Sequence, residues 1–361
     1  MKKLFFLSMT ICLSLIVNAA DVMVDGVYYN LSINDKVAVV TYRDNTYNSY
    51  SGNVVIPSSF SYGGTEYSVT KIGNSAFRDC SDLTSIDIPE SVTIIDSYAF
   101  KGCNSLTSLN TQNSVTSIGE YAFQGCSGLT SVTIPNSVTY LGEGAFQSCS
   151  SMTSLAIGNS LSGIGAHAFQ YCSSLTNVTI PNSVTIIREY AFHYCSSLIS
   201  VTIGSGVKSI ADRAFATCPE LAVIYCFAKE VPNSPYGSNS DMFNKSQIGK
   251  ATLYVRTSLI EQYKAKNPWY DFGTITSLDC IDGIYYNFFD NDEAEVTYRD
   301  EGYNSYSGDV DIPASVTSVW GTTYTVKSIG DNAFKDCSNQ ISITIPNSVI
   351  SIGNAAFYGC I

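Results

Sequence analysis

The sequence predicts a repeat solenoid built mainly of β structure, and two observations support this prediction. The first is a phenylalanine that recurs every 23 residues, at Phe77, Phe100, Phe123, Phe146, Phe169, Phe192 and Phe215, and again at Phe334 and Phe357. The second is its setting, because each of these residues follows an alanine and precedes a cysteine by three residues. A fixed period of this length indicates stacked coils, since one coil cannot bury its apolar face alone.

The composition indicates a neutral, hydrogen-bonding surface. Charged residues make up 14% of the 361, the formal net charge is −12, and there are 25 tyrosines. A protein that binds nucleic acid needs a basic face, so this charge argues against a nucleic-acid partner.

Residues 1–20 are typical of a secretory signal peptide. Lys2 and Lys3 precede an apolar run from Leu4 to Val17, and Ala19 and Ala20 supply small residues for cleavage. The apolar run is shorter than the roughly 20 residues of a spanning helix, and no second run follows it. We therefore expect a chain without a membrane span that is secreted or held at the cell surface.

Residues 21–64 do not carry the period and are predicted to form a β cap. Two strand-like runs, 24–30 and 37–42, flank a turn at Asn34-Asp35. Residues 54–57 then resemble the middle of a repeat. A capping unit of this kind keeps the first coil from exposing its core.

Residues 65–226 form the predicted first array. Counted from each phenylalanine, Leu or Met stands at +6, Ile, Leu or Val at +9, and usually Ile at +11. This Leu-x-x-Val-x-Ile spacing is the strand signature of a leucine-rich repeat. Pro135 or Gly158 at +12 ends the strand, and a second apolar pair at +15 and +18 follows. Thr111-Gln112 breaks the pattern once and predicts a local irregularity.

Residues 227–279 leave the period and are predicted to close the first array. Residues 251–255 are expected to form a strand, and Thr257 or Ser258 is expected to cap a short helix that ends near Ala265. The apolar side chains of Trp269, Phe272 and Ile275 are then predicted to form a lid on the last coil.

The chain then begins again. Residues 280–333 repeat the first cap, with 281–287 matching 24–30, and residues 334–361 hold an incomplete second array of two Ala-Phe coils. Because about three repeats are needed to bury a continuous core, the second array is expected to have an open apolar end. Two explanations remain: the chain is a fragment of a longer reading frame, or the open C-terminal coil is covered by a partner or, through self-association, by a second copy.

The repeat, written AF-x-x-C-S-x-L-T-S-V-T-I-P-x-S-V-T-x-I, resembles the BspA-like leucine-rich repeat family of bacterial surface proteins over about residues 54–226 and 310–360. The segment 254–272 resembles that family's array terminator. The resemblance implies an exported protein of host-associated bacteria that adheres to an extracellular protein or glycan ligand. The alternative is an architectural surface protein without a specific ligand site.

No motif in the sequence indicates an enzyme, a cofactor or a metal site. His167 and His193 are the only histidines, and neither belongs to a metalloprotease motif. Cys195 lies close to His193, but it is one of nine cysteines in the same repeat position, which predicts buried free thiols rather than a nucleophile. Cys226 and Cys280 lie outside this series, and a disulfide between them remains open.

Two surfaces are candidates for binding a ligand. The first is an aromatic patch predicted from the residues two positions before and after the phenylalanine, which include His167, Tyr171, Tyr190 and Tyr194. Tyrosine is a favoured interface residue, although the same rings could simply brace neighbouring coils. The second is a field of hydroxyl groups on the outer side of the predicted strands, which includes Thr133, Thr179 and Thr202. Such a field suits protein or glycan surfaces, and equally a solvated sheet face.

Overall fold

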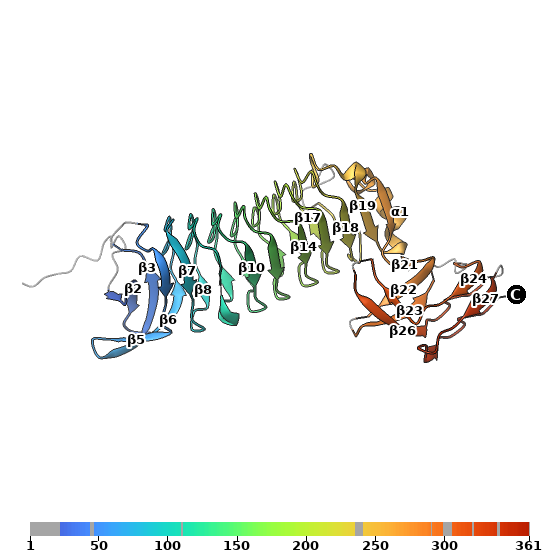
Figure 1. Cartoon of the computed structure of the whole chain (residues 1–361), viewed down its shortest axis with the longest axis horizontal. Coiled ribbons are helices and arrows are strands. Elements are labelled where there is room, and N and C mark those ends of the chain that lie inside the picture. The colour runs from blue at the N-terminus through green and yellow to red at the C-terminus, as the bar shows by residue number, and fades with distance from the viewer. Residues whose placement is uncertain are drawn as a thin grey trace, which may run out of the picture.

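The computed structural model describes residues 22–43, 47–109, 111–234, 241–289, 291–298, 305–319, 321–337 and 340–360. The expected signal peptide lies outside these residues. Figure 1 shows a long stack of coils with a β cap at its start, and a second, smaller β unit that follows the end of the stack. The predicted mainly β repeat solenoid is confirmed.

The first cap is a β hairpin joined to the first coil. β1 (Val22–Val24), β2 (Val27–Ser32) and β3 (Val37–Thr41) are antiparallel, and the turn between β2 and β3 contains Asn34-Asp35 as predicted. β3 then pairs in parallel with β6 (Thr65–Ile72), which forms a hairpin with β5 (Ser59–Tyr62). Tyr50 closes the core, because its ring lies 4.5 Å from that of Phe77 and its hydroxyl accepts the Tyr28 N–H at 3.0 Å.

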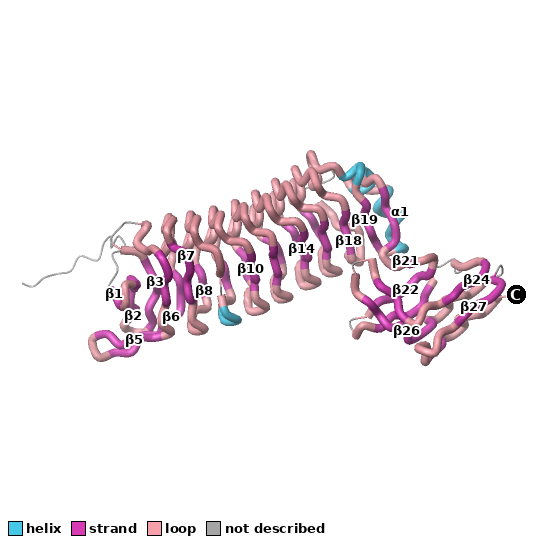
Figure 2. Tube along the Cα trace, in the orientation of Figure 1, coloured by secondary structure: helices cyan, strands magenta, loops and turns pink. Residues whose placement is uncertain are grey.

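Each coil of the first array has three sides (Figure 2). The first side is a longer strand whose alternate residues point inward. These strands are β4 (Gly52–Val55), β7 (Leu83–Asp87), β10 (Ser131–Ile134), β12 (Ser154–Ile157), β14 (Asn177–Ile180), β16 (Ser200–Ile203) and β18 (Val223–Cys226). The second side is a two-residue strand, in β8 (Ile94–Ile95), β9 (Ser117–Ile118), β11 (Tyr140–Leu141), β13 (Gly163–Ile164), β15 (Ile186–Ile187) and β17 (Ser209–Ile210).

The predicted irregularity at Thr111-Gln112 is confirmed. A 3-10 helix, η1 (Gln112–Ser114), occupies this coil. Among the described residues, this coil has no strand on the first side, so β7 is followed on that side by β10. The strand side of the array is therefore interrupted here.

The third side is the turn that contains the Ala-Phe pair. Its alternate backbone N–H groups donate to carbonyls of the next coil, as in Phe100 N–H to Ala122 at 2.7 Å and Tyr98 N–H to Glu120 at 2.8 Å. The residues two positions before and after each phenylalanine adopt left-handed backbone angles, with φ of +53° to +62° in the non-glycine residues from Ser75 to Thr217. Apart from Ser75, which is buried, the non-glycine side chains at these positions are at least partly exposed.

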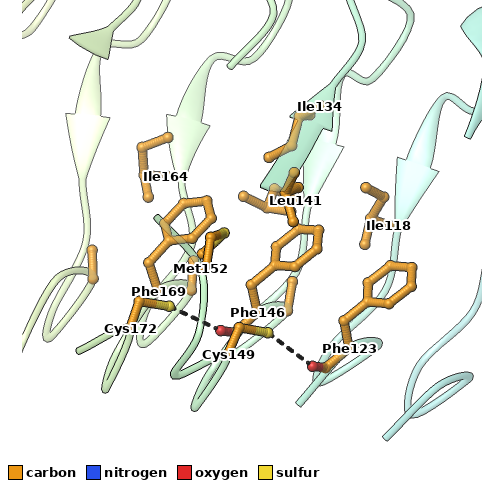
Figure 3. Packing of buried hydrophobic residues seen from close by; sticks show 14 of the residues in the cluster. Ile118, Phe123, Ile134, Leu141, Phe146, Cys149, Met152, Ile164, Phe169 and Cys172 are labelled. Carbon is orange, nitrogen blue, oxygen red and sulfur yellow. Dashed lines mark hydrogen bonds between the residues drawn. The ribbon is translucent and has the colours of Figure 1, made fainter. Parts of the chain in front are cut away.

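The phenylalanines stack on one another along the whole array. Successive rings from Phe77 to Phe215 lie 4.9 to 5.7 Å apart and nearly parallel, and each ring is fully buried. The cysteines add a second series, because each thiol from Cys103 to Cys218 donates to the carbonyl of the phenylalanine in the preceding coil. Figure 3 shows Cys149 bonded to Phe123 and Cys172 bonded to Phe146, both at 3.3 Å.

The predicted free thiols are confirmed among the described cysteines. Cys80 to Cys218 in the array are buried and unpaired. Cys226 and Cys280 are free as well, so the open possibility of a disulfide between them is answered in the negative. The Cys226 thiol instead lies 3.2 Å from the Tyr263 hydroxyl.

The terminating cap extends the sheet and then covers it. β19 (Thr252–Val255) and β20 (Thr274–Ser277) continue in parallel from β18. Short helices connect them, namely η2 (Ile248–Lys250), η3 (Thr257–Leu259), α1 (Ile260–Lys264) and η4 (Trp269–Asp271). Trp269 and Phe272 are buried in the lid, as predicted, and Ile275 packs against the same core.

Two details of this cap differ from the sequence prediction. The prediction that Thr257 or Ser258 caps the helix is wrong, because neither side chain makes a capping hydrogen bond. The Thr257 hydroxyl instead lies 2.6 Å from the Ser277 hydroxyl of β20, so it forms a tertiary hydrogen bond rather than a helix cap. Phe243, not predicted as part of the stack, continues it with its ring 6.0 Å from Phe215. It was missed because Met242 replaces the alanine and the spacing of 23 is lost.

The second unit repeats the first cap and holds its own core. It consists of β21 (Cys280–Ile281), β22 (Ile284–Phe288), β23 (Glu293–Thr297), β24 (Gly308–Asp311), β25 (Ser315–Thr317), β26 (Thr323–Ile329), β27 (Gln340–Thr344) and β28 (Ser351–Ile352). Tyr306 lies 4.5 Å from Phe334, as Tyr50 does from Phe77. In the last coil Ile350 is 80% exposed and Ile352 is 54% exposed, so its outer face is open within the described residues.

Candidate functional site

The structure brings the four predicted aromatic residues together on the turn side of two neighbouring coils. His167 stacks on Tyr190 at 4.9 Å, and Tyr171 stacks on Tyr194 at 5.0 Å. His193 lies between these pairs, 5.2 Å from Tyr190 and 4.4 Å from Tyr194. We call these five residues the aromatic patch. Tyr171 and Tyr194 are its most exposed members, at 43% and 40%.

Four of the five patch residues occupy strained backbone positions. His167, Tyr171, Tyr190 and Tyr194 have φ between +56° and +62°, in the left-handed region. A residue with a Cβ atom pays on the order of 1–2 kcal/mol there, which glycine avoids. Glycine does stand at equivalent positions of earlier coils, with Gly102 and Gly125 matching the two tyrosines after the phenylalanine and Gly144 matching the residues before it. The fold therefore does not require bulky aromatic side chains at these positions.

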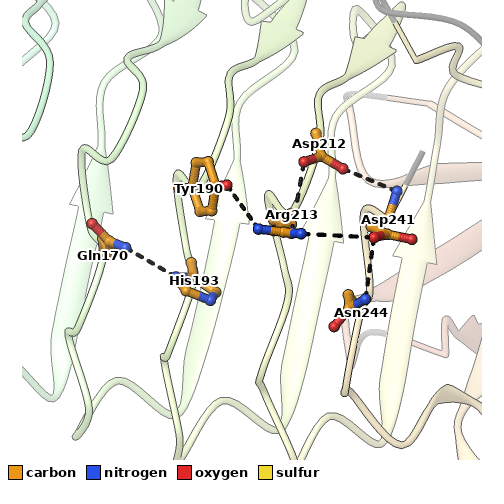
Figure 4. A network of polar contacts seen from close by, with 7 residues as sticks. All are labelled: Gln170, Tyr190, His193, Asp212, Arg213, Asp241 and Asn244. Carbon is orange, nitrogen blue, oxygen red and sulfur yellow. Dashed lines mark hydrogen bonds and ion pairs between the residues drawn. The ribbon is translucent and has the colours of Figure 1, made fainter. Parts of the chain in front are cut away.

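A row of hydrogen-bonded polar side chains contacts the two histidines of the patch. These side chains follow the phenylalanine directly and run from Gln124 through Gln147 and Gln170 to His193. Gln147 Nε2 donates to Gln170 Oε1 at 2.5 Å, and Gln170 Nε2 lies 2.9 Å from His193 Nδ1 (Figure 4). Gln170 also lies 2.9 Å from Nδ1 of His167. The row was missed in the sequence, although its recurrence every 23 residues was a visible signal.

The surroundings of His193 favour its neutral form. Burial lowers the pKa of His193 below its ordinary value, and the positive charge of Arg213 lowers it further. A neutral imidazole can accept the Gln170 amide hydrogen bond at Nδ1, which is the arrangement that the row of amides indicates. The histidine therefore acts here as a fixed hydrogen-bonding group.

A charged cluster borders the patch on the side of the terminating cap. Arg213 Nη1 donates to the Tyr190 hydroxyl at 3.0 Å, and the guanidinium lies 3.7 Å from Asp212 and 4.0 Å from Asp241. Asn244 Nδ2 in turn donates to Asp241 at 3.2 Å (Figure 4). The orientation of the Tyr190 ring is thus set from both sides, by His167 and by Arg213.

The predicted hydroxyl field lies on another side of the coil. Thr133 on β10 and Thr179 on β14 are exposed, and Thr202 on β16 is half-buried. Thr179 is directly paired with Thr202, whereas the partner of Thr133 is Ala156. The row of threonines is thus interrupted by Ala156. Because the strands and the Ala-Phe turns are different sides of the coil, the hydroxyl field is separate from the aromatic patch.

The thiols lie in an environment that suppresses nucleophilic chemistry. Burial raises the pKa of Cys149 to about 12 and that of Cys195 well above its ordinary value. Only a thiolate is a good nucleophile, so these groups are inert in the fold. Within the described parts of the chain, no three His, Cys, Asp or Glu side chains are grouped to hold a metal ion. Nor does any helix in those parts have the length and apolar character for crossing a bilayer.

Comparisons with known proteins identify the repeat. The BspA type leucine rich repeat region matches residues 56–176, 162–294 and 311–361, with six copies. No curated protein matches the chain.

Among solved structures, a leucine-rich cell surface protein from Faecalibacterium prausnitzii A2-165 is 26% identical with a TM-score of 0.51, covering 94% of this chain and 74% of its own. A leucine-rich repeat protein from Bacteroides ovatus is 20% identical with a TM-score of 0.48, covering 94% and 92%. The leucine-rich repeat protein of T. pallidum is 25% identical with a TM-score of 0.48, covering 55% and 90%. The matched repeats span more than half of the sequence, and the chain therefore belongs to the BspA-type family of leucine-rich repeat surface proteins.

Proposed function

We propose that the protein is an exported binding module that adheres to host or neighbouring-cell surfaces through a protein or glycan ligand. Export is supported by the charged start and apolar run of residues 1–20. It is also supported by the similar structure from F. prausnitzii, which is described as a cell surface protein.

The aromatic patch is the observation that carries this proposal. Tyr171 and Tyr194 expose large rings at backbone positions where the fold accepts glycine. In other coils the same position holds Ser148 or Thr217, so packing does not require these rings, which supports a role in function. Tyrosine also supplies a large rigid contact area, which makes it a common anchor residue at interfaces.

An architectural role is the second candidate, and ring stacking favours it. The pairs His167–Tyr190 and Tyr171–Tyr194 each link two coils at about 5 Å between centroids. A brace of this kind would stabilise the array without a ligand. The two roles predict different results when the rings are removed.

The experiment is a binding screen with matched variants. The protein is tested against immobilised extracellular-matrix proteins and glycans, and then with Tyr171→Ser, Tyr190→Ser and Tyr194→Ser combined. We expect binding to be lost while the unfolding midpoint changes little. The control combines Tyr98→Ser and Tyr121→Ser, because these rings stack in the same way at 5.5 Å but lie outside the patch. Equal loss of stability in both variants, with binding retained, would support the brace instead.

We also propose self-association through the last coil. Ile345, Ile350 and Ile352 are between 40% and 80% exposed, and exposed apolar groups next to strand edges favour pairing with another chain. The molar mass in solution, measured over a range of concentrations, tests this. Ile350→Lys should abolish any dimer, and a strictly monomeric parent protein would contradict the idea.

A further inference from the structure

A groove separates the strand side of the first array from the second cap. Its volume is about 790 Å³, within the range of roughly 300–1,000 Å³ that is typical of small-ligand sites. The array lines it with Thr179, Thr202 and Asn159, and the second cap lines it with Phe288, Phe289 and Tyr324. Two threonines of the hydroxyl field thus face aromatic rings from a unit more than 80 residues further along the chain.

Two of the three rings in the aromatic wall are specific to the second cap, whereas Tyr324 has an equivalent in Tyr67 of the first cap. The paired registers of the two caps align Phe288 with Leu31 and Phe289 with Ser32, so the first cap has no ring at either position. The Phe288 ring lies 4.7 Å from Tyr324, which holds it in place. The Phe289 backbone N–H donates to the backbone carbonyl of Glu293 at 3.0 Å, and the Phe289 residue remains 46% exposed. An exposed phenylalanine therefore stands where the duplicated unit has a small polar residue.

The array wall is shaped by a small residue in the threonine row. Ala156 lines the groove at the position that Thr133 and Thr179 occupy in other coils. The shorter side chain hollows the sheet surface beside Thr179. The floor of the groove therefore combines hydroxyl and amide groups with apolar side chains such as Ile157 and Ile180, opposite an aromatic wall.

The chemistry of the groove selects its occupant. Among the residues that the structure describes, Asp292 is the one charged side chain in the lining, and no Lys or Arg lies there to pair with an acidic ligand. The formal charge of −12 on the whole chain further disfavours anionic polymers. A neutral ligand with many hydroxyl groups and apolar C–H faces matches both walls, because C–H groups pack on aromatic rings and hydroxyls bond to Thr and Asn.

An extended peptide fits less well. Peptides commonly bind by adding a strand to a free sheet edge. In the cap, β22 lies between β21 and β23, and β26 lies between β23 and β25. In the array, β16 lies between β14 and β18. These strands have both edges occupied. β12 and β14 also line the groove and each ends a sheet, but they contact each other in the stack, so their free edges face one another and offer no backbone ladder to a peptide in the groove.

We propose that this groove binds a neutral glycan chain, with Phe289 as the stacking residue and Thr179 and Thr202 as hydrogen-bonding residues. The inference rests on the proposed binding function but places a ligand at a surface separate from the aromatic patch. The stacking residue belongs to the second cap and the two hydroxyl residues belong to the first array, so recognition needs both units, which gives the duplication a role.

The test is affinity gel electrophoresis of the full chain in gels that contain a neutral β-glucan, a galactomannan or an arabinoxylan. A gel with acidic polygalacturonate serves as the charged comparison. Phe289→Ser installs the residue of the first cap, and Thr179→Val removes one hydroxyl with little change in volume. The matched controls are Thr133→Val, in the same row outside the groove, and Tyr140→Ser, which removes an exposed ring outside both the groove and the aromatic patch.

We expect at least one neutral polysaccharide to retard the parent protein. Phe289→Ser should weaken binding by about tenfold and Thr179→Val by several-fold, whereas both controls bind like the parent. Retardation by none of the neutral polymers, retardation by the acidic polymer alone, or equal effects of Thr179→Val and Thr133→Val would overturn the inference. Loss of matrix binding in the Tyr171, Tyr190 and Tyr194 variant is a separate result, so the two proposals can fail independently.

Discussion

The two arrays carry the same repeat but bury it to different extents. In the first array every ladder phenylalanine and cysteine is buried, since a coil or a cap covers it on each side. In the second array Phe334 and Cys337 are buried, whereas Phe357 and Cys360 one coil later are only partly buried. Identical residues therefore differ in their packing because of the neighbours above and below them. In a one-dimensional stack, stability depends on these neighbour contacts.

The largest difference is expected from removing a stacked ring. Phe146→Ala deletes a ring that lies 5.0 Å from Phe123 and 5.7 Å from Phe169, and should cost roughly 3–5 kcal/mol of unfolding free energy. Phe357→Ala removes a ring with one stacked neighbour, Phe334, and should cost much less. Urea unfolding of both variants measures this. Equal costs would argue against a one-dimensional stack.

A smaller loss is expected at alkaline pH, and mainly in the first array. Burial raises the pKa of Cys80, Cys149 and Cys218 to about 12, from an ordinary value of 9.0. The folded state thus holds these protons more tightly than the unfolded chain. The stability that they contribute is complete below about pH 9 and is lost as the pH rises towards 12.

Hydrogen exchange at about pH 8 and about pH 10, corrected for the intrinsic rate, can locate this loss. Protection should fall further around Cys149 than around Cys360, whose thiol is less deeply buried. A uniform fall across both arrays would show that the ladder thiols are not its cause.

The two caps provide a comparison in which equal effects are expected. The Tyr50 hydroxyl donates to the Thr41 carbonyl and accepts the Tyr28 N–H. The Tyr306 hydroxyl makes the same two hydrogen bonds, with the Thr297 carbonyl and the Tyr285 N–H. Replacing either by Phe leaves buried backbone groups without this partner, at a cost of about 1–3 kcal/mol. Thermal unfolding of Tyr50→Phe and Tyr306→Phe should show similar losses. A loss at one site alone would mean that the duplicated caps are not equivalent.

The smallest effect concerns the row of amides. Gln147→Ala breaks the hydrogen bonds to Gln124 and Gln170 and should cost about 0.5–1.5 kcal/mol. Tyr358 holds the same position in the last coil and is 68% exposed, so Tyr358→Ala should change stability by less than about 0.5 kcal/mol. Chemical denaturation measures both, and no loss in Gln147→Ala would show that the amide row is not structural.

Much of the site geometry could be predicted from the repeat. A period of 23 residues places His167 beside Tyr190 and Tyr171 beside Tyr194, and the structure shows both pairs stacked. The contribution of His193 was not predicted, because it depends on the hydrogen bond from Gln170 rather than on an aromatic column. The left-handed backbone at these positions was also not visible in the sequence, since tyrosine is not a residue that normally signals it.

The sequence by itself determined the fold class, the number of Ala-Phe coils, the inward direction of the phenylalanines and cysteines, and the duplication of the cap. It could do so because each coil contacts its neighbours in register, which turns a spacing in the chain into a contact in space. Only the tertiary structure decided which thiol or ring is buried on both sides, that Phe243 continues the stack, and that Phe289 faces Thr179 across a groove. These features join residues outside the period, and no repeat spacing encodes the packing of one unit against another.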